Sequence, residues 1–167
     1  MDDICTRIKI IPVSQCLIHE GIMEKLVDQI ASNFRNDGVM KNPIIVTLHQ
    51  GRYVVLDGMH RCAAVQQLGI PDILVFEVDY FSKEVVLEPP HRKEDILEKT
   101  LKGKILPPKS TRHLISGRPL RVDLPLSVLN GPDDLEAKNR LLQEHLKWCY
   151  ENNRVRFYPE SVYVFAD

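Results

Sequence analysis

Short apolar runs and segments with helical spacing alternate along the first half of the chain. The run Tyr53–Leu56 is rich in β-branched residues, as a buried strand is. Ile22, Leu26 and Ile30 instead repeat at the spacing of one helix face. The order of strand, helix, strand hairpin, helix and strand predicts a small mixed α/β layer fold of the α+β type. The predicted strands are Ile8–Val13, Ile44–Leu48, Tyr53–Leu56 and Ile73–Val78, and the predicted helices are Met23–Phe34 and a segment between Gly58 and Gly69.

The pattern weakens after Asp79. Two adjacent prolines and a charged run precede a weak helical repeat over Ile96–Leu101. We therefore expect residues 81–109 to form a short helical excursion on the surface rather than part of the core. The following segment, Pro107–His113, is expected to be an ordered polar loop with many potential ligands.

The last third of the chain predicts a strand, a helix and a strand. Leu120–Leu124 alternates apolar and polar residues, as a half-exposed strand does. That strand is expected to continue through Pro125–Leu129, with a helix over Leu135–Tyr150, a cap at Asp133 or Asp134, and a final strand over Ser161–Phe165. We expect one domain over residues 1–167, with a phosphate-binding core in 1–80 and a C-terminal part, 110–167, that completes the site.

A sharp turn separates the predicted strand Tyr53–Leu56 from the helix that follows it. A strand that turns directly into a helix leaves unpaired N–H groups at the helix start, where phosphate binds readily. Asp57 can coordinate a divalent cation, and Gly58 lets a ligand approach the backbone closely. His60 and Arg61 can neutralise phosphate oxygens. In the alternative interpretation Asp57 only caps the helix and the two basic residues are solvated, but the combination favours a phosphate and metal site.

Composition and charge narrow the classes of function. The 167 residues are 44% hydrophobic and 27% charged, as in a soluble globular domain. Lys and Arg number 22 against 23 Asp and Glu, so the chain lacks the basic excess of a general nucleic-acid binder. No apolar run approaches the roughly 20 residues that cross a bilayer, and the first residues are acidic where a signal peptide is basic. These features predict a cytoplasmic protein that binds neither membrane nor DNA.

The cysteines and most histidines do not suggest a metal site. The four cysteines form no Cys-x-x-Cys pair, so we expect buried, reduced thiols. His19, His49, His91 and His145 share no metal-ligand spacing, and structural or solvated roles are expected for them.

The segment Asn42–Val46, followed by Tyr53–Ala64, resembles the ParB/sulfiredoxin superfamily. Sulfiredoxins carry a cysteine between the glycine and the histidine of the turn, where this chain has Met59, so the resemblance does not extend to peroxiredoxin repair. ParB proteins use the same unit to bind a nucleotide, but the chain shows no helix-turn-helix segment of the ParB type.

The resemblance is closer to the free L-serine kinases of this superfamily, which include a siderophore-locus enzyme and an archaeal ADP-dependent enzyme. It rests on three motifs, and the chain departs from the family in a shorter middle segment. The motifs are His19-Glu20, Asp57–Arg61, and Thr111–Arg118 running into Leu124–Leu129.

This resemblance implies phosphoryl transfer from ATP or ADP to the hydroxyl of free L-serine, with Mg²⁺ as cofactor. Such a reaction asks mainly for positioning, charge neutralisation and a base. Glu20 is then the base, Asp57 the metal ligand and a second catalytic carboxylate. The residues expected at the nucleotide and its phosphates are Gly58, Met59, His60, Arg61, Ser110, Thr111, Arg112 and His113. The alternative for the last four is an ordered, proline-led loop.

Two other functions remain open at this point: a nucleotide-binding regulator, and a nucleotide hydrolase in which water replaces serine. The sequence also leaves open which nucleotide donates the phosphoryl group and whether the chain forms an oligomer.

Overall fold

A five-stranded mixed sheet forms the centre of the molecule in the computed structural model, which describes residues 6–117, 119–152, 156–157 and 162–165. The strand order is β1-β6-β4-β5-β2. β4 pairs with β5 in the antiparallel and with β6 in the parallel direction, and β2 is parallel to β5. The strands are β1 (Ile8–Pro12), β2 (Cys16–Leu17), β4 (Ile44–His49), β5 (Arg52–Asp57) and β6 (Asp72–Glu77).

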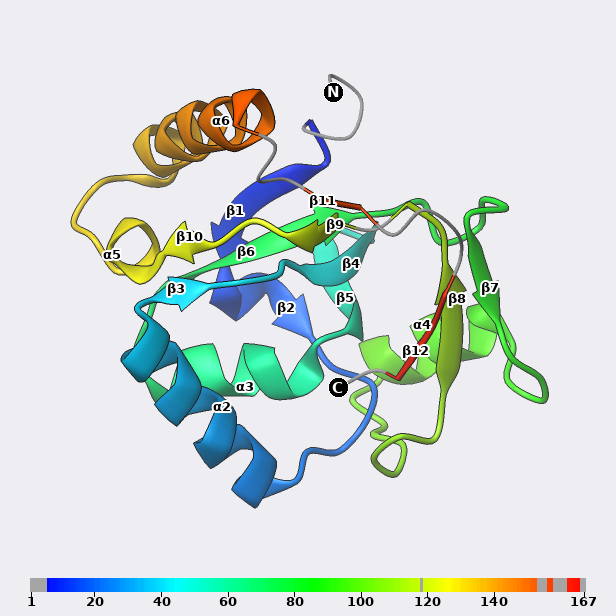
Figure 1. The fold of residues 1–167 in the computed structure, drawn as a ribbon. Helices are drawn as coiled ribbons and strands as arrows, with labels where there is room; N and C mark the ends of the chain where they lie inside the picture. The colour runs from blue at the N-terminus through cyan, green and yellow to red at the C-terminus, as the bar shows by residue number, and fades with distance from the viewer. Residues whose placement is uncertain (1–5, 118, 153–155, 158–161, 166–167) are drawn as a thin grey trace.

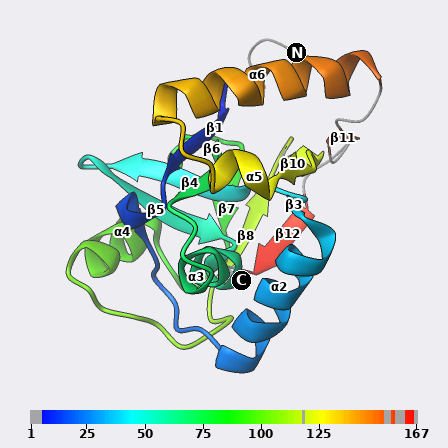
Figure 2. The same cartoon turned by 90° about the vertical axis from the view of Figure 1, so that its left-hand side faces the viewer.

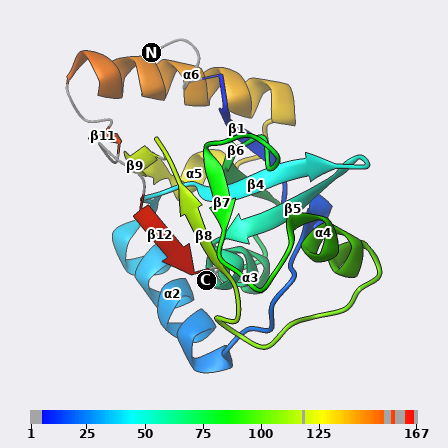
Figure 3. The same ribbon diagram turned by 90° about the vertical axis from the view of Figure 1, so that its right-hand side faces the viewer.

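Helices lie above and below this sheet in all three views (Figures 1, 2 and 3). The lower helices, α2 (Glu24–Asp37) and α3 (Met59–Gln67), pack against each other, and α3 contacts β4 and β6. The upper helices are α5 (Leu126–Leu129) and α6 (Leu135–Glu151). Because both faces are covered, Ile73, Leu74, Val75 and Phe76 are all fully buried in succession along β6.

Helix α6 protects the edge strand β1. Asn139 accepts a hydrogen bond from the Ile10 backbone N–H at 2.9 Å and donates to the Ile10 carbonyl at 3.0 Å. Lys138, one residue earlier, forms a buried ion pair with Asp72 at 2.7 Å. The backbone N–H and carbonyl of Ile10 at this edge of the sheet are therefore hydrogen-bonded to a side chain and are not available to pair with another strand.

Residues 81–109 contribute to the core, so the prediction of a surface excursion is wrong. β7 (Val85–Leu87) belongs to a second sheet of order β12-β8-β7, with β8 (Arg112–Ile115) and β12 (Val162–Phe165). Val85 and Ile96 are each 1% exposed. The helix α4 (Lys93–Leu101) begins three residues before the predicted one, because the charged run forms its solvated first turn. Pro107–His113 is likewise only partly a loop, since its last two residues begin β8.

Residues 119–129 form two short strands and a helical turn rather than one continuous strand. β9 (Pro119–Arg121) and β10 (Leu124–Pro125) are separated by Asp123, whose φ of 53° breaks an extended strand. Pro125 then precedes α5, where a fixed φ suits the start of a helix. β10 pairs with β3 (Val39–Met40), and β9 pairs with β11 (Arg156–Phe157).

The remaining predictions of elements agree with the structure. Asp134 caps α6 by accepting from the Ala137 N–H at 2.8 Å. The final strand spans Val162–Phe165, whereas Ser161 lies outside the described residues. Cys16, Cys62 and Cys149 are buried, as expected. Within the ranges given above, no helix has the length and apolar character needed to cross a membrane.

Candidate active site

The turn from β5 into α3 has a backbone conformation that only glycine adopts easily. Gly58 is the N-cap of α3 and has a φ of 100°. A Cβ atom at this position would lie 2.4 Å from Cγ2 of Ile44 and 2.9 Å from a guanidinium nitrogen of Arg61. The space in front of Gly58 is therefore filled by Ile44 and Arg61, and only glycine lets β5 turn directly into α3, whose first amides are the candidate anion site.

Arg61 braces this turn. Its Nη1 donates to the carbonyls of Asn42 and Pro43 at 3.0 and 3.1 Å, and its Nη2 lies 3.4 Å from Oδ2 of Asp57. The Asp57 side chain is only 5% exposed and the Arg61 side chain 19%. The structure therefore brings Asp57, the predicted metal ligand, next to Arg61, a predicted phosphate ligand. These contacts hold the guanidinium in place.

A surface cavity of about 280 Å³ opens beside Arg61. Its walls come from α2, from β3 and from the segment between β3 and β4. Lys41 adds a second cation to the cavity and pairs with Asp37 at 3.1 Å. The cavity thus joins apolar walls, two cations and carboxylate or amide acceptors, and its lining residues are Ile30, Asn33, Phe34, Asp37, Val39, Lys41, Asn42 and Arg61.

His60 has a structural contact that the sequence did not reveal. The side chain is 1% exposed, and its Nε2 accepts a hydrogen bond from the Met23 N–H at 2.9 Å. Met23 is the N-cap of α2, so His60 satisfies a backbone donor at the start of that helix. A ring nitrogen that accepts from an amide carries no proton, so this nitrogen does not donate to a phosphate.

Glu20 lies against the first turn of α3, although 37 residues separate it from Asp57. Its backbone N–H donates to Sδ of Met59 at 3.3 Å. On its other side the loop pairs with Leu106 through two backbone hydrogen bonds. The Gly21 N–H donates to the Leu106 carbonyl at 2.7 Å, and the Leu106 N–H donates to the His19 carbonyl at 2.8 Å. The loop that carries Glu20 is therefore held between α3 and the segment that leads into β8.

The Glu20 carboxylate is buried and hydrogen-bonded. Oε1 accepts from the Ser110 N–H at 3.0 Å, and Oε2 accepts from the Thr111 N–H at 3.3 Å and from the Thr111 hydroxyl. Burial acts to raise the pKa of this carboxyl, but hydrogen bonds from His19, Thr111 and Ser110 outweigh it and hold the pKa below the ordinary 4.5. Glu20 is therefore ionised at neutral pH.

The four residues predicted from Ser110 to His113 divide between two faces. Ser110 and Thr111 reach Glu20, as described above. The Arg112 side chain points away from Glu20 and forms an ion pair with Glu88 at 3.3 Å. His113 is fully buried and its Nε2 lies 2.9 Å from the Tyr80 hydroxyl. Burial, with the nearby charge of His19, lowers the pKa of His113 to about 3, so its ring is neutral and offers a phosphate no positive charge. That His113 contacts the nucleotide stays a prediction.

His19 belongs to the site, whereas the sequence favoured a structural or solvated role for it. Its Nε2 lies 3.0 Å from Oγ1 of Thr111 and 3.5 Å from Oε2 of Glu20. The spacing of the histidines argues against a metal site, but it says nothing about contacts with an acid and a hydroxyl, which are the contacts that His19 makes. Its position next to Glu20 in the chain was the only available signal.

The donor set at Asp57 suits Mg²⁺ only in the presence of a nucleotide. Throughout the described part of the chain, no group of three or more His, Cys, Asp or Glu side chains is arranged to hold a metal ion. One buried carboxylate beside an anion site nevertheless fits Mg²⁺, which is commonly held by one or two carboxylates together with phosphate oxygens.

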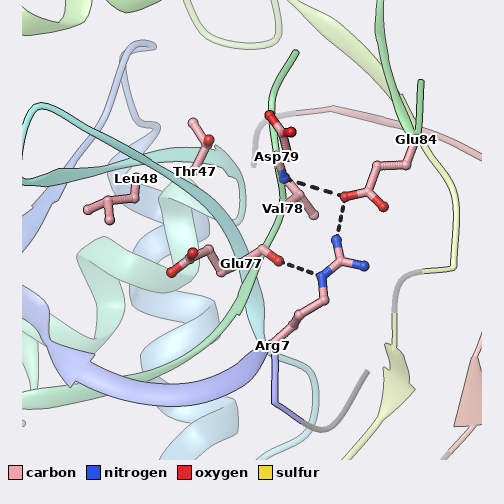
Figure 4. A pocket seen from close by; sticks show the side chains of 7 residues that line it. All are labelled: Arg7, Thr47, Leu48, Glu77, Val78, Asp79 and Glu84. Carbon is pink, nitrogen blue, oxygen red and sulfur yellow. Dashed lines mark hydrogen bonds and ion pairs between the residues drawn. The ribbon is translucent and has the colours of Figure 1, made fainter. Parts of the chain in front are cut away.

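A second cavity, of about 470 Å³, lies at the end of β4 away from Asp57 (Figure 4). Its lining holds one cation, Arg7, and three carboxylates, Glu77, Asp79 and Glu84. Arg7 forms an ion pair with Glu84 and donates from Nε to the Glu77 carbonyl at 2.9 Å. The Glu84 carboxylate also lies 3.4 Å from the Asp79 N–H. This cavity is separate from the candidate site.

Comparison with known proteins found similar sequences and similar folds. The ParB N-terminal domain family matches residues 6–88. The matched residues include Glu20 and the turn from Asp57 to Arg61, whereas Ser110 and Thr111, which contact Glu20, lie outside them.

The sequence relatives include an ATP-dependent L-serine kinase from Staphylothermus marinus. It is 38% identical over 81 residues, which cover 47% of this chain and 32% of that protein. The chain therefore matches about a third of the length of its curated relatives.

Two solved structures share the fold over more of this chain than the residues that the family model matches. SbnI with a C-terminal truncation, from Staphylococcus aureus, superposes with a TM-score of 0.82 at 19% identity and covers 90% of this chain and 100% of that one. A free serine kinase in complex with AMP has a TM-score of 0.69 at 15% identity and covers 74% of this chain and 93% of that one. The predicted mixed α/β fold is confirmed.

Proposed function

We propose that this chain transfers a phosphoryl group from ATP or ADP to the hydroxyl of free L-serine and so produces O-phospho-L-serine. The observation that carries the proposal is the contact between the Glu20 backbone N–H and Met59, which brings the residue with the ionised carboxylate next to the first turn of α3. The 38% identity over 81 residues to a protein named ATP-dependent L-serine kinase supports the choice of reaction.

The nucleotide is assigned to the cavity beside Arg61. Its apolar walls suit a purine ring, and Asn33 and Asp37 offer acceptors and donors for ribose hydroxyls. The phosphates then extend past Arg61 and Lys41 toward the first turn of α3, whose backbone N–H groups suit an anion. Mg²⁺, held by Asp57 and the phosphates, would neutralise charge on the phosphate oxygens.

Glu20 is assigned the role of general base. The serine oxygen attacks the terminal phosphorus, the bond between that phosphorus and its bridging oxygen breaks, and the shortened nucleotide leaves. The hydroxyl proton goes to the Glu20 carboxylate. An acid that is already ionised at neutral pH needs no prior deprotonation for this step.

Access to Glu20 requires a small change at Ser110. The carboxylate is 1% exposed, and the Ser110 N–H occupies Oε1. Ser110 itself is only half-buried and follows exposed Pro107, Pro108 and Lys109. A substrate hydroxyl therefore reaches Oε1 when it takes the place of one backbone donor, and the other oxygen keeps its partners.

The proposal is tested by incubating the protein with Mg²⁺, L-serine and either ATP or ADP, and by measuring phosphoserine by mass spectrometry. We expect phosphoserine to accumulate with at least one nucleotide and only when serine is present. Nucleotide loss that does not depend on serine would identify a hydrolase. Nucleotide binding without turnover would identify a regulator, and either result would overturn the proposal.

A further inference from the structure

We propose that His19 and Thr111 are positioning residues for Glu20, and that the Thr111 hydroxyl relays protons between the Glu20 carboxylate and the His19 imidazole. The inference rests on the proposed function, since it assigns these residues to the base of that reaction. The three side chains form one continuous line of contacts from a backbone carbonyl to the carboxylate.

The fixed end of this line is the carbonyl of Val55 in β5. Nδ1 of His19 lies 3.0 Å from that oxygen, and both groups are buried. A carbonyl oxygen only accepts hydrogen bonds, so Nδ1 carries the proton of this contact. The tautomer of His19 is thereby set, and only Nε2 remains to change its protonation.

The other three atoms of the line are Nε2 of His19, Oγ1 of Thr111 and Oε2 of Glu20. Two hydrogens are needed to form both hydrogen bonds among them. One hydrogen lies between Nε2 of His19 and Oγ1 of Thr111, which are 3.0 Å apart, and another lies between Oγ1 and Oε2 of Glu20. The hydroxyl supplies one hydrogen, and the second belongs either to the imidazole or to the carboxyl. A concerted shift of both hydrogens along the line converts an imidazolium–carboxylate pair into a neutral pair, with no change in total charge.

The arrangement also distinguishes the two carboxylate oxygens. Oε2 accepts from the Thr111 hydroxyl and the Thr111 N–H, and Nε2 of His19 lies 3.5 Å away. Oε1 accepts from the Ser110 N–H alone among the described residues. Oε2 is therefore the anchored oxygen, and Oε1 is the oxygen that takes the proton from the substrate.

Other titratable groups lie near this line among the described residues. Nε2 of His91 lies 3.0 Å from the carbonyl of Ser110, whose N–H donates to Glu20. The His113 ring lies 6.0 Å from the His19 ring and is itself hydrogen-bonded to Tyr80. Lys93 of α4 lies beyond, 5.4 Å from the centre of the Tyr80 ring. On the side of α3, the Glu20 loop meets the uncharged thioether of Met59.

The test measures protonation directly and does not depend on activity. The Glu20 carboxyl carbon and the His19 ring nitrogens are followed by NMR between pH 3 and pH 9, with Glu20→Gln to assign the carboxyl signal. We expect both signals to respond to the same protonation steps, with Nδ1 of His19 protonated throughout. Independent titration of the two groups, or an unprotonated Nδ1, would overturn the inference in the unmodified protein.

Thr111→Val removes the hydroxyl at nearly constant volume, and Thr111→Ser restores it. In Thr111→Val we expect the Glu20 midpoint to rise by about one pH unit, because a hydrogen bond to the charged form is lost, and the two titrations to separate. The kcat for phosphoserine formation should fall about 10-fold with an unchanged KM for nucleotide, and Thr111→Ser should restore both. Unchanged curves in Thr111→Val would contradict the relay. Coupled titration in a protein that makes no phosphoserine would instead overturn the proposed function and leave the relay intact.

Discussion

The sulfur of Met59 accepts the backbone N–H of Glu20 at 3.3 Å. This contact joins the loop that carries the candidate base to the helix that offers the phosphate site. Met59 is fully buried, so its thioether also fills the space beneath that loop. The relative placement of base and phosphate therefore depends on an uncharged side chain.

Met59→Leu tests this dependence. Leucine conserves the volume but removes the acceptor, so we expect a loss of stability below about 1.5 kcal/mol and a fall in kcat of about 10-fold from misplacement of Glu20. Urea unfolding and phosphoserine formation are measured together. Met40→Leu, at an equally buried position on β3, is the matched control and should leave kcat unchanged. Equal effects of the two substitutions on kcat would contradict the role of Met59.

Gly58→Ala should damage the turn more than an alanine at another glycine with positive φ. At Gly51, where φ is 76°, the added Cβ meets open space, whereas at Gly58 it meets Ile44 at 2.4 Å. We expect Gly51→Ala to cost about 1–2 kcal/mol of unfolding free energy. Gly58→Ala should cost more and should also weaken nucleotide binding at least about 10-fold. Calorimetric titration with ATP and ADP measures the binding, and unchanged affinity in folded Gly58→Ala would contradict a close approach of phosphate to this turn.

Arg61→Lys should weaken nucleotide binding although the charge is kept. Lysine cannot donate at once to Asn42, Pro43 and a ligand as the guanidinium does, so we expect an affinity about 10-fold lower. Arg112→Lys is the control, since that side chain pairs with Glu88 on the other face. If both variants bind ATP and ADP like the unmodified protein, the cavity beside Arg61 is not the nucleotide site.

The sequence predicted the half of the site that is local in the chain. Asp57, Gly58 and Arg61 lie within five residues, so the strand-to-helix turn brings them together whatever the rest of the fold does. The contact of Glu20 with Thr111 joins residues that are 91 positions apart and could be anticipated only from the resemblance to the serine kinases.

The errors came from residues whose direction depends on strand pairing. His113 pairs with Val164 and with Leu87 in the three-stranded sheet, and this register buries its ring while Arg112 points to the opposite face. The alternation of buried and exposed side chains along β8 could not be recognised in the sequence, because the segment has the composition of a polar loop. The contact of His60 with Met23 could not be predicted for a similar reason, because it depends on how α2 packs against α3.

His113 should make the stability of the fold depend on pH. Its pKa is about 3 in the folded protein against an ordinary 6.5, so below pH 6.5 the unfolded chain binds a proton that the folded chain does not. The contribution of neutral His113 to the free energy of unfolding is therefore fully present above pH 6.5 and declines as the pH falls toward 3. Glu20 adds a decline only below its ordinary pKa of 4.5. Between pH 6.5 and 4.5, urea unfolding of His113→Gln should show a shallower decline than that of the unmodified protein, and parallel curves would refute this assignment.

The central claim is that Glu20 serves as the base of a serine-dependent phosphoryl transfer. Its most direct measurement is the rate of phosphoserine formation by the unmodified protein, by Glu20→Gln and by Glu24→Gln, an exposed control in the first turn of α2. We predict that Glu20→Gln lowers kcat by about 10²–10⁴ while the Kd for nucleotide changes less than about two-fold, and that Glu24→Gln behaves like the unmodified protein. Phosphoserine formation at an undiminished rate in Glu20→Gln, or none in the unmodified protein with either nucleotide, would contradict the claim.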